Sequence, residues 1–525
     1  MELELVLALG MFLTAIAALL AGYPVALTLG GVALIFGLIG VQLDLIPLPI
    51  LRNLPSRMLG SMENQVLIAV PLFVLMGVIL ERSKVADDLL HTASRLLARV
   101  RGGLGYAVVI VGALLAASTG IVGATVITMT LIALPTMLRQ GYDPRLATGT
   151  IAASGTLGQI IPPSIVLILL ADAVSNANQS AAMRSGGGAG VVSVGDLFAG
   201  ALLPGLLLVS LYLLYLMITA ILRPGASPAV VREEESDSLT LTEIARSLGA
   251  PLLLIIAVLG SILGGLASPT EASAIGAGGA LLLAGLRLAP EHSKTGDLGS
   301  IWGAFISVIL LGLMTNTLDL TVTRDDLGTV DYLTIGLAGF ASLVFLGGLL
   351  SAARVLMRAS QFGSALTAGA QITSMVFLIL IGASLFALVF RAYGGEHYVE
   401  ALLTSIPGGL WGALAITMLV MFILGFFLDF IEIVFVVVPI VAPPLIILGA
   451  DPVWLAILMA LNLQTSFLTP PFGFALFYLR GAAPDAVETM DIWRGAIPFI
   501  GLQLVMIALV AAIPALATWL PAFVR

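Results

Sequence analysis

The stretch Gly141-Tyr142-Asp143-Pro144 returns 308 residues later as Gly449-Ala450-Asp451-Pro452. Nineteen residues after the aspartate of each copy comes a proline pair, Pro162-Pro163 and then Pro470-Pro471. Between aspartate and prolines, each copy is an apolar run broken by polar residues, Ser154-Gly155-Thr156 and Asn462-Leu463-Gln464-Thr465-Ser466. Membrane helices interrupted at corresponding places in two halves of a chain point to the binding site of a transporter. Two kinked helices without a shared role are the alternative, but the equal spacing of two separate motifs argues against it.

Composition places the chain in a membrane. Apolar residues make up 59% of its 525 residues and charged residues only 10%, which is typical of integral membrane proteins. There is no cysteine, and the three histidines lie in polar stretches, so disulfides and thiol catalysis are excluded and a histidine-rich metal site is disfavoured. Both lysines follow a serine, which does not fit the Gly-Lys-[Ser/Thr] of a nucleotide-binding loop. We expect no cofactor, no enzymatic activity and no nucleic-acid partner.

A spanning helix needs about 20 apolar residues. The sequence predicts spans near residues 3–22, 24–41, 66–80, 146–172, 197–222, 249–264, 270–288, 302–320, 332–351, 367–391, 453–478 and 495–520. The acidic start, Met1-Glu2-Leu3-Glu4, indicates a retained helix rather than a secretory signal.

Two further apolar segments, 104–137 and 409–447, are predicted to be re-entrant hairpins. The first is 34 residues long with small residues at its middle, whereas two crossings and a turn need more than about 40 residues. Gly425 and Asp429 lie near the tip of the second segment. A non-helical tip must be buried in protein or face a water-filled cavity.

Positive charge predicts the orientation. If the chain starts outside and each hairpin returns to its own side, the inside loops hold 16 of the 22 lysines and arginines, in agreement with the positive-inside rule. These loops are residues 81–103, 138–145, 223–248, 287–301, 352–363 and 480–494. Both termini are then expected on the outer, periplasmic face of the membrane.

The same arrangement predicts an inverted repeat. Seven crossings and one hairpin separate Asp143 from Asp451, and because seven is odd the two copies face opposite sides. We expect a first repeat over residues 1–222, a polar cytoplasmic linker over 223–248 and a second repeat over 249–525. Within the second repeat, about 302–351 is predicted to be an inserted helix pair. The predicted fold class is an all-α polytopic membrane protein with two re-entrant hairpins and two broken helices.

Broken helices expose half-helix ends. Their N-termini favour anionic groups, and their freed carbonyls and C-termini favour Na⁺. Hydroxyl, amide and carbonyl oxygens are suitable ligands for such a hard cation. Hydrogen bonding of the serines and threonines to their own helix, or helix packing, is the alternative role. The predicted Na⁺ and substrate cluster consists of Ser118, Thr119, Gly120, Gly123, Ser154, Gly155, Thr156, Gly425, Asp429, Asn462, Thr465 and Ser466.

Charged residues within apolar runs are further candidates. Asp429 and Glu432 lie in the run from Leu410 to Val441, and intramembrane carboxylates are functional-site hypotheses by default; a wet hairpin mouth with a gating role is the alternative. Glu271 either acts in function or caps a helix start. Arg391 either attracts an anion or extends to the membrane surface.

These residues resemble the large membrane subunit of tripartite ATP-independent periplasmic (TRAP) transporters. Within that family, the motifs are most similar to those of the mannitol/chloroaromatic compound subgroup. The resemblance covers roughly residues 1–290 and 365–520, and the segment 291–363 departs from it. It is carried by Ser118–Ala124, Gly141–Pro144, Ala153–Ser164, Pro269–Ala272, Gly425–Asp429 and Asn462–Gly473.

The resemblance implies an elevator-type carrier in the bacterial inner membrane that takes up a small organic acid with a Na⁺ gradient. It implies two partners, a small four-helix membrane subunit and a periplasmic solute-binding protein, beside the carboxylate substrate and membrane lipid. A stand-alone carrier of related fold, proton-coupled through Asp429, is the alternative. A polytopic enzyme would need a clustered nucleophile, metal site or acid pair, which the sequence does not contain.

Overall fold

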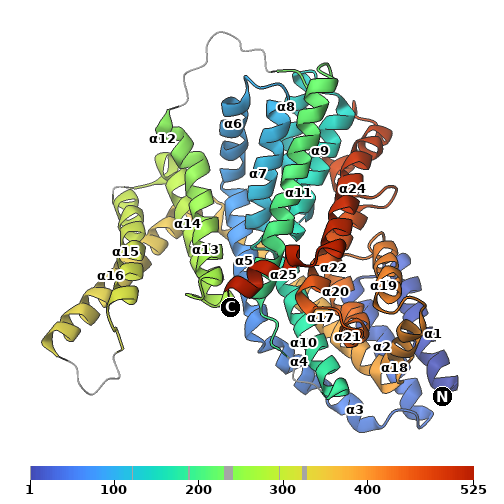
Figure 1. Ribbon diagram of the computed structural model, residues 1–525. Coiled ribbons are helices and arrows are strands. Elements are labelled where there is room, and N and C mark those ends of the chain that lie inside the picture. Colours follow the sequence, from blue (N-terminus) through green and yellow to red (C-terminus); the bar gives the residue numbers. More distant parts are fainter. Residues whose placement is uncertain are drawn as a thin grey trace.

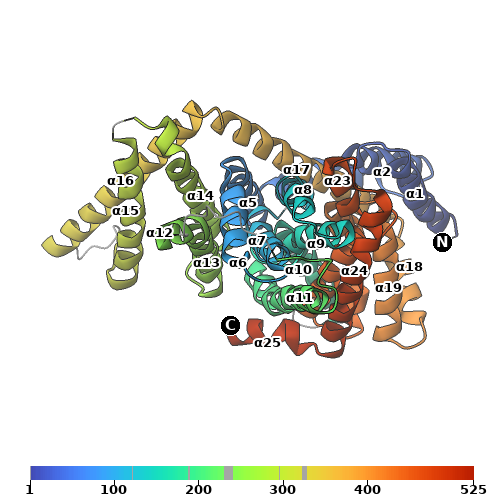
Figure 2. The same cartoon turned by 90° about the horizontal axis from the view of Figure 1, so that it is seen from above.

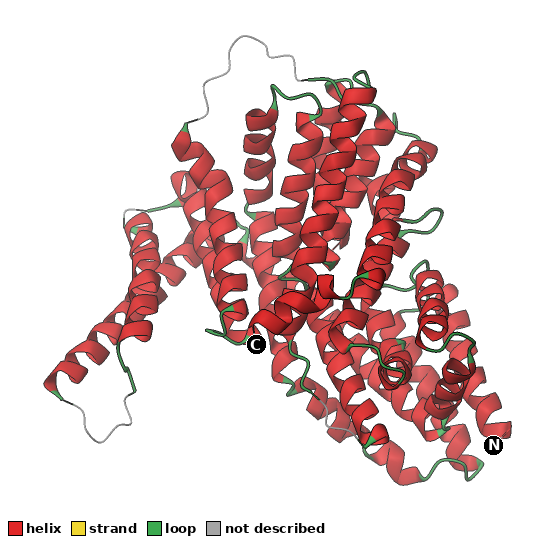
Figure 3. Cartoon of the chain, viewed as in Figure 1, coloured by secondary structure: helices red, strands yellow, loops and turns green. Residues whose placement is uncertain are grey.

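The computed structural model describes residues 2–120, 122–186, 190–229, 240–294, 296–321 and 328–524, and this part of the chain consists of helices and loops (Figure 3). The first half contains α1 (Glu2–Leu20), α2 (Val25–Gln42), α3 (Leu48–Arg52), α4 (Leu54–Met62), α5 (Gln65–Arg82), α6 (Val85–Leu97), α7 (Gly103–Thr119), α8 (Val122–Arg139), α9 (Pro144–Thr156), α10 (Ile165–Ser185) and α11 (Val194–Leu222).

The second half contains α12 (Leu241–Ile244), α13 (Ala250–Leu263), α14 (Pro269–His292), α15 (Asp297–Thr317), α16 (Thr329–Arg358), α17 (Phe362–Ala392), α18 (Gly395–Ser405), α19 (Leu410–Leu424), α20 (Phe430–Val436), α21 (Val438–Ile447), α22 (Pro452–Leu468), α23 (Phe474–Ala482), α24 (Thr489–Ala512) and α25 (Ala515–Val524). In the described part, ten helices are long and apolar enough to cross a membrane, or up to twelve if each bent pair is one span.

The two halves pack in matching ways. Helix α14 of the second half lies along α5 of the first, and α2 of the first half lies along α17 of the second. Likewise α8 packs on α23, and α10 packs on α21. Each of these contacts between a helix of the first half and a helix of the second half therefore has a counterpart formed by the corresponding helices of the opposite halves. A two-fold relation between α5–α10 and α17–α23 produces such paired contacts.

The repeated Gly-x-Asp-Pro motif starts the two broken helices. Gly141 and Gly449 adopt positive φ angles of 80° and 102°, a backbone that suits glycine after a helix end. The following aspartates cap the next helix, since Asp143 accepts from the Arg145 N–H and Asp451 from the Trp454 N–H. Proline then occupies the first helical position, where its missing N–H costs nothing. One helix thus ends and the next begins within four residues.

Both predicted broken helices are confirmed, but the breaks lie after the predicted polar residues. In the first repeat, α9 ends at Thr156 and a short 3-10 helix, η1 (Leu157–Gln159), follows it before the chain leaves helical geometry. Ser154-Gly155-Thr156 form the last turn of α9, and the sequence Asn462–Ser466 lies inside α22. The chain leaves helical geometry later, over 160–164 before α10 and over 469–473 before α23, at the two proline pairs. Proline removes a backbone donor and clashes with the preceding turn, whereas buried serine and threonine are tolerated in helices because they bond to the backbone.

The structure also contains both hairpins. Helices α7 and α8 meet at Gly120, whose φ is +60°, and α19 meets α20 across the tip 425–429. In the second hairpin the returning arm is bent by 55° between α20 and α21. Asp429 starts α20 through a capping box with Glu432. The predicted limits, 104–137 and 409–447, agree closely with 103–139 and 410–447.

Other elements differ from the prediction. Two short helices precede the hairpins: α6 lies in the segment 81–103, which was expected to be a loop, and α18 lies in a segment for which no element was predicted. The last predicted span, 495–520, is two helices, because Pro514 separates α24 from α25. The inserted pair is present as α15 and α16, which extend away from the body of the molecule beside α13 and α14 (Figure 2). Glu233-Glu234-Glu235 of the predicted linker lie outside the described residues.

Several of the predicted inside and outside elements lie toward opposite ends of the molecule, whereas the C-terminus, predicted outside, lies between those ends (Figure 1). Figure 1 shows α6 and α12 toward one end, and α3, α4, α18 and the N-terminus toward the other. Which end faces the periplasm stays a prediction.

Candidate functional site

Each hairpin tip lies against the broken helix of its own repeat. A Cβ atom added to Gly120 would lie 3.1 Å from the backbone nitrogen of Ile165, at the start of α10. A Cβ added to Gly425 would lie 2.9 Å from the Cβ of Ser466 and closer still to its Oγ. A side chain at either position would force neighbouring atoms to move, and the positive φ of Gly120 further favours glycine there. The glycines predicted from the sequence are therefore points where the hairpin backbone packs closely against the broken helix.

Further contacts fasten the hairpins to the helices before the breaks. A Cβ on Gly112 of α7 would lie 2.6 Å from the Cβ of Ser154, and one on Gly155 would clash with Val126 of α8. In the second repeat, the Asn462 Nδ2 donates to the Met418 carbonyl of α19 at 2.9 Å. Each candidate cluster thus has walls from a hairpin and from a broken helix.

The candidate hydroxyl groups donate to their own helices. The Oγ atoms of Ser154 and Ser466 donate to the carbonyls of Thr150 and Leu463, at 2.6 and 2.8 Å. Thr156 and Thr465 do the same toward Ala153 and Leu461. The alternative role considered from the sequence, hydrogen bonding of these hydroxyl groups to their own helix, is therefore present. A hydroxyl that donates its proton still has oxygen lone pairs for a cation, so the two roles are compatible.

One hydrogen bond joins equivalent positions of the repeat. The Gln464 Nε2 donates to the Thr156 Oγ1 at 3.4 Å, and these residues are 308 positions apart, the offset of the sequence repeat. Equivalent residues contact each other only where they lie close to the axis that relates the halves. The Gln503 Nε2 of α24 also reaches the Thr156 Oγ1, at 3.5 Å, and the Tyr212 Oη of α11, at 2.8 Å.

This buried polar centre was missed from the sequence. Gln159, Gln464 and Gln503 are completely buried. Both amide atoms of Gln159, and the Oε1 atoms of the other two, have no hydrogen-bond partner in the described protein. Gln159 and Gln464 stand inside the motifs quoted above, but nothing local shows that Gln503 joins them from another helix.

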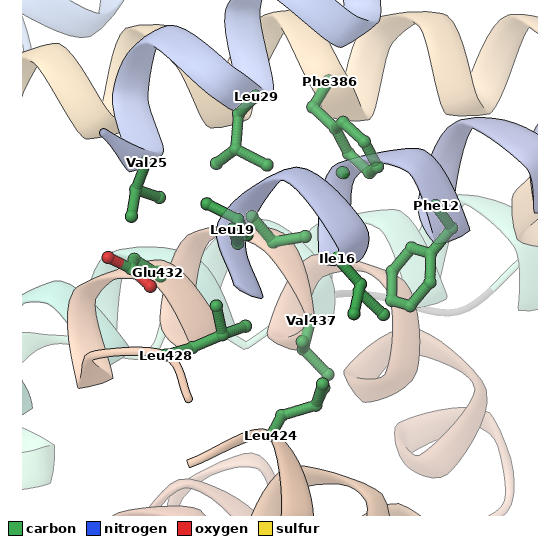
Figure 4. Close-up of a pocket in the computed structure, with 12 residues that line it drawn as sticks. Phe12, Ile16, Leu19, Val25, Leu29, Phe386, Leu424, Leu428, Glu432 and Val437 are labelled. Atoms are coloured by element: carbon green, nitrogen blue, oxygen red, sulfur yellow. The ribbon is translucent and has the colours of Figure 1, made fainter. Parts of the chain in front are cut away.

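The two intramembrane carboxylates have different surroundings. The Asp429 carboxylate accepts from the Phe430 N–H at 2.7 Å and lies within electrostatic range of the Tyr478 phenol. A Cβ on Gly123 of the first hairpin would lie 2.9 Å from the Tyr478 ring, so Tyr478 stands near both tips. Glu432 accepts from the Asp429 N–H at 3.1 Å and lines a small pocket against α1 and α2 (Figure 4). Glu432 is therefore part of the interface between the second hairpin and helices α1 and α2.

The remaining candidates have structural partners. Glu271 forms a capping box with Ser268 at the start of α14, which is one of the two roles predicted for it. Arg391 pairs with Glu396 at 2.7 Å. The side chains of Ser118 and Thr119 lie outside the described part of the structure.

No lysine occurs in the hairpins or the broken helices. The arginines of the first hairpin and of the first broken helix stand at the ends of helices. A cation in either cluster would meet neutral oxygens and one carboxylate, Asp429. An anion there would rely on N–H groups, hydroxyls and a bound cation rather than on an arginine.

Comparison with known protein families shows which family the chain belongs to. Residues 12–315 and 294–516 match the family described as "Tripartite ATP-independent periplasmic transporter, DctM component". The chain belongs to this family. It is therefore a multi-pass TRAP permease subunit of the bacterial inner membrane. The two matches overlap over 294–315, within the region of α15, where the inserted pair begins.

Several curated relatives match over most of their length. The C4-dicarboxylate TRAP transporter large permease protein DctM of Vibrio cholerae is 26% identical over 515 residues, covering 97% of this chain and 96% of the relative. The protein of the same name from Pseudomonas aeruginosa is 28% identical over 473 residues, covering 90% and 89%. The ectoine TRAP transporter large permease protein TeaC of Halomonas elongata is 25% identical over 517 residues, covering 97% and 98%. Each of these relatives is named as a large permease protein of a TRAP transporter.

A solved structure supports the fold. The YdaH transporter of Alcanivorax borkumensis, described as having an unusual topology, matches with a TM-score of 0.51 and 14% identity, covering 90% of this chain and 88% of that one. At this identity the likeness concerns the fold alone.

Proposed function

We propose that this DctM-type permease carries a small carboxylate into the cell together with Na⁺. The observation that supports it most is the close seating of each hairpin tip against its broken helix. Gly120 lies against Ile165, the first residue after one break, and Gly425 lies against Ser466, in the last turn before the other break. Such a seat would place backbone groups near the helix end and buried hydroxyl oxygens together away from lipid, which suits a hard cation. Each repeat has a seat of this kind, although the two contacts are not at equivalent positions of the repeat.

The bound cation would supply the charge that an organic anion needs. The described site residues include no arginine or lysine to pair with a carboxylate, and Asp429 would repel one. Na⁺ bound beside the hairpin tips offsets that repulsion, so substrate and Na⁺ favour each other's binding. Coupling of the two follows from the electrostatics of the site.

The proposed partners are a small four-helix membrane subunit and a periplasmic solute-binding protein. Membership of a tripartite family supports this assembly. Relatives named for C4-dicarboxylates and ectoine provide the first compounds to test.

Uptake into proteoliposomes tests the proposal. The permease, reconstituted with a small TRAP membrane subunit and a solute-binding protein, should accumulate a substrate when Na⁺ is higher outside, and ATP should make no difference. Replacing Na⁺ by K⁺ should abolish accumulation. Equal uptake in Na⁺-free buffer across pH values would overturn Na⁺ coupling, and accumulation without a binding protein would favour the stand-alone carrier.

A further inference from the structure

A cluster of aromatic side chains lies beside the second candidate site. It comprises Phe422 of α19, Phe426 and Phe427 of the hairpin tip, and Phe472 of the helix break. The ring centroids of Phe427 and Phe472 are 5.3 Å apart, and those of Phe426 and Phe472 are 6.4 Å apart. We call these four residues the aromatic wall.

The aromatic wall directly adjoins the polar part of the site. Phe426 follows Gly425, the residue that touches Ser466, and Phe427 comes two residues before Asp429. Phe472 belongs to the non-helical segment 469–473 that follows the predicted ligand Ser466. A ligand held by the polar atoms of this tip would therefore have the wall beside it.

Two rings of the wall are exposed. Phe427 is 43% and Phe472 is 44% exposed, and Tyr478 nearby is 41% exposed. Both phenylalanines stand on non-helical backbone, which at membrane depth is tolerated only where it is buried in protein or lines a water-filled cavity. Their exposed faces are thus expected to front an aqueous or protein-lined space rather than lipid. Apolar surface that faces such a space is suited to bind an apolar part of a ligand or partner.

We infer that the substrate carries an apolar ring or chain next to its carboxylate, and that Phe427 and Phe472 form the surface on which this apolar part packs. The inference rests on the proposed function, since it takes the same hairpin tip as the substrate site. A short dicarboxylate is polar at both ends and leaves this wall uncovered. An aryl or alkyl carboxylate covers the wall with its apolar part and leaves its carboxylate to the polar atoms.

Ligand-induced thermal stabilisation of the purified full chain in lipid nanodiscs tests the inference without a binding protein, because a ligand that binds only the folded state raises its stability. Phenylacetate and succinate are the probes, each in Na⁺ and in K⁺. We expect phenylacetate to stabilise the protein in Na⁺ more than succinate does. Phe427→Leu and Phe472→Leu should each weaken phenylacetate binding roughly twofold to tenfold, the worth of an aromatic contact.

Phe477→Leu is the matched control, because Phe477 is 57% exposed on α23 but does not belong to the wall. Stabilisation by succinate as strong as by phenylacetate, or an equal loss in the control, would overturn the inference. So would a loss of thermal stability in the wall variants without a change in ligand preference, which would assign the wall to packing alone. The proposed function is judged separately, by whether Na⁺ itself stabilises the protein more than K⁺.

Discussion

Replacing Gly425 with alanine should weaken Na⁺ dependence specifically. Gly425 has a right-handed helical backbone with φ of −66°, so alanine is tolerated there conformationally. Its new methyl group, however, would lie 2.9 Å from the Ser466 Cβ, and ordinary contact begins at 3.4 Å. The tip must therefore withdraw by about 0.5 Å, the difference between these two distances.

The Ser466 hydroxyl must move as well. It lies closer to the new methyl than its Cβ does, and rotation away breaks its hydrogen bond to the Leu463 carbonyl. A lost hydrogen bond costs about 1 kcal/mol, and overpacking a tight site costs about 1–3 kcal/mol. If the seated tip is the Na⁺-bound geometry, a cost of about 1–3 kcal/mol raises the Na⁺ concentration for half-maximal uptake roughly fivefold to 150-fold.

Uptake measured against Na⁺ concentration in proteoliposomes provides the assay. Ser466→Gly removes both the opposing side chain and a predicted ligand, so adding Gly425→Ala to Ser466→Gly should cost less Na⁺ affinity than Gly425→Ala costs in the unchanged protein, as a double-mutant cycle would show. Gly31→Ala is the matched control, because nothing lies within 4 Å of its added Cβ. A Gly425→Ala protein with unchanged Na⁺ half-saturation, whether or not it is less stable, would refute the assignment of this tip to the ion site.

Three further predictions follow from single contacts. Asp429→Asn should raise the Na⁺ requirement more than Glu432→Gln, because Asp429 stands at the tip and Glu432 faces α1 and α2; equal Na⁺ titrations of the two variants would contradict this. Glu396→Gln should lower stability by about 1–3 kcal/mol in thermal unfolding, because its buried carboxylate accepts from two arginines. Gly149→Ala should reduce the yield of folded protein, because the added Cβ would lie 2.5 Å from a backbone carbonyl carbon of α24. Gly501→Ala on α24 is the control and should have little effect, because its added Cβ meets nothing within 4 Å.

The order of elements was predictable because short motifs specify local geometry. Gly141, Asp143 and Pro144 each satisfy one requirement of a helix end or start, so their recurrence at Gly449 and Asp451 indicated a second copy. Segment length identified the hairpins for a similar reason, since it limits how often a chain can cross a bilayer.

The errors have equally local causes. Polar residues were taken as the helix breaks, but the hydroxyls of Ser154 and Thr465 bond to their own helices and leave the backbone helical. The prolines that follow are what end helical geometry. Pro514 was overlooked because the residues on both sides of it are apolar and together long enough for one span.

The contacts that make the site depend on distant residues and could not be predicted from either copy. Nothing near Gly425 in the sequence indicates that Ser466 will lie against it, and nothing near Thr156 indicates Gln503. The repeat does provide a partial signal. A residue on the two-fold axis must approach its own equivalent, but which of the repeated positions lies on that axis is decided by the packing of whole helices.

The near-symmetry of the backbone and the asymmetry of the side chains point to different tasks. Both tips approach their broken helices through glycine, at Gly120 and Gly425, and we propose ion binding for both repeats. Only the second tip carries a carboxylate, Asp429, and an aromatic wall. Because an organic acid is recognised by side-chain shape and charge as well as by backbone groups, the second repeat is where we expect substrate selectivity to lie, while ion binding is shared by both.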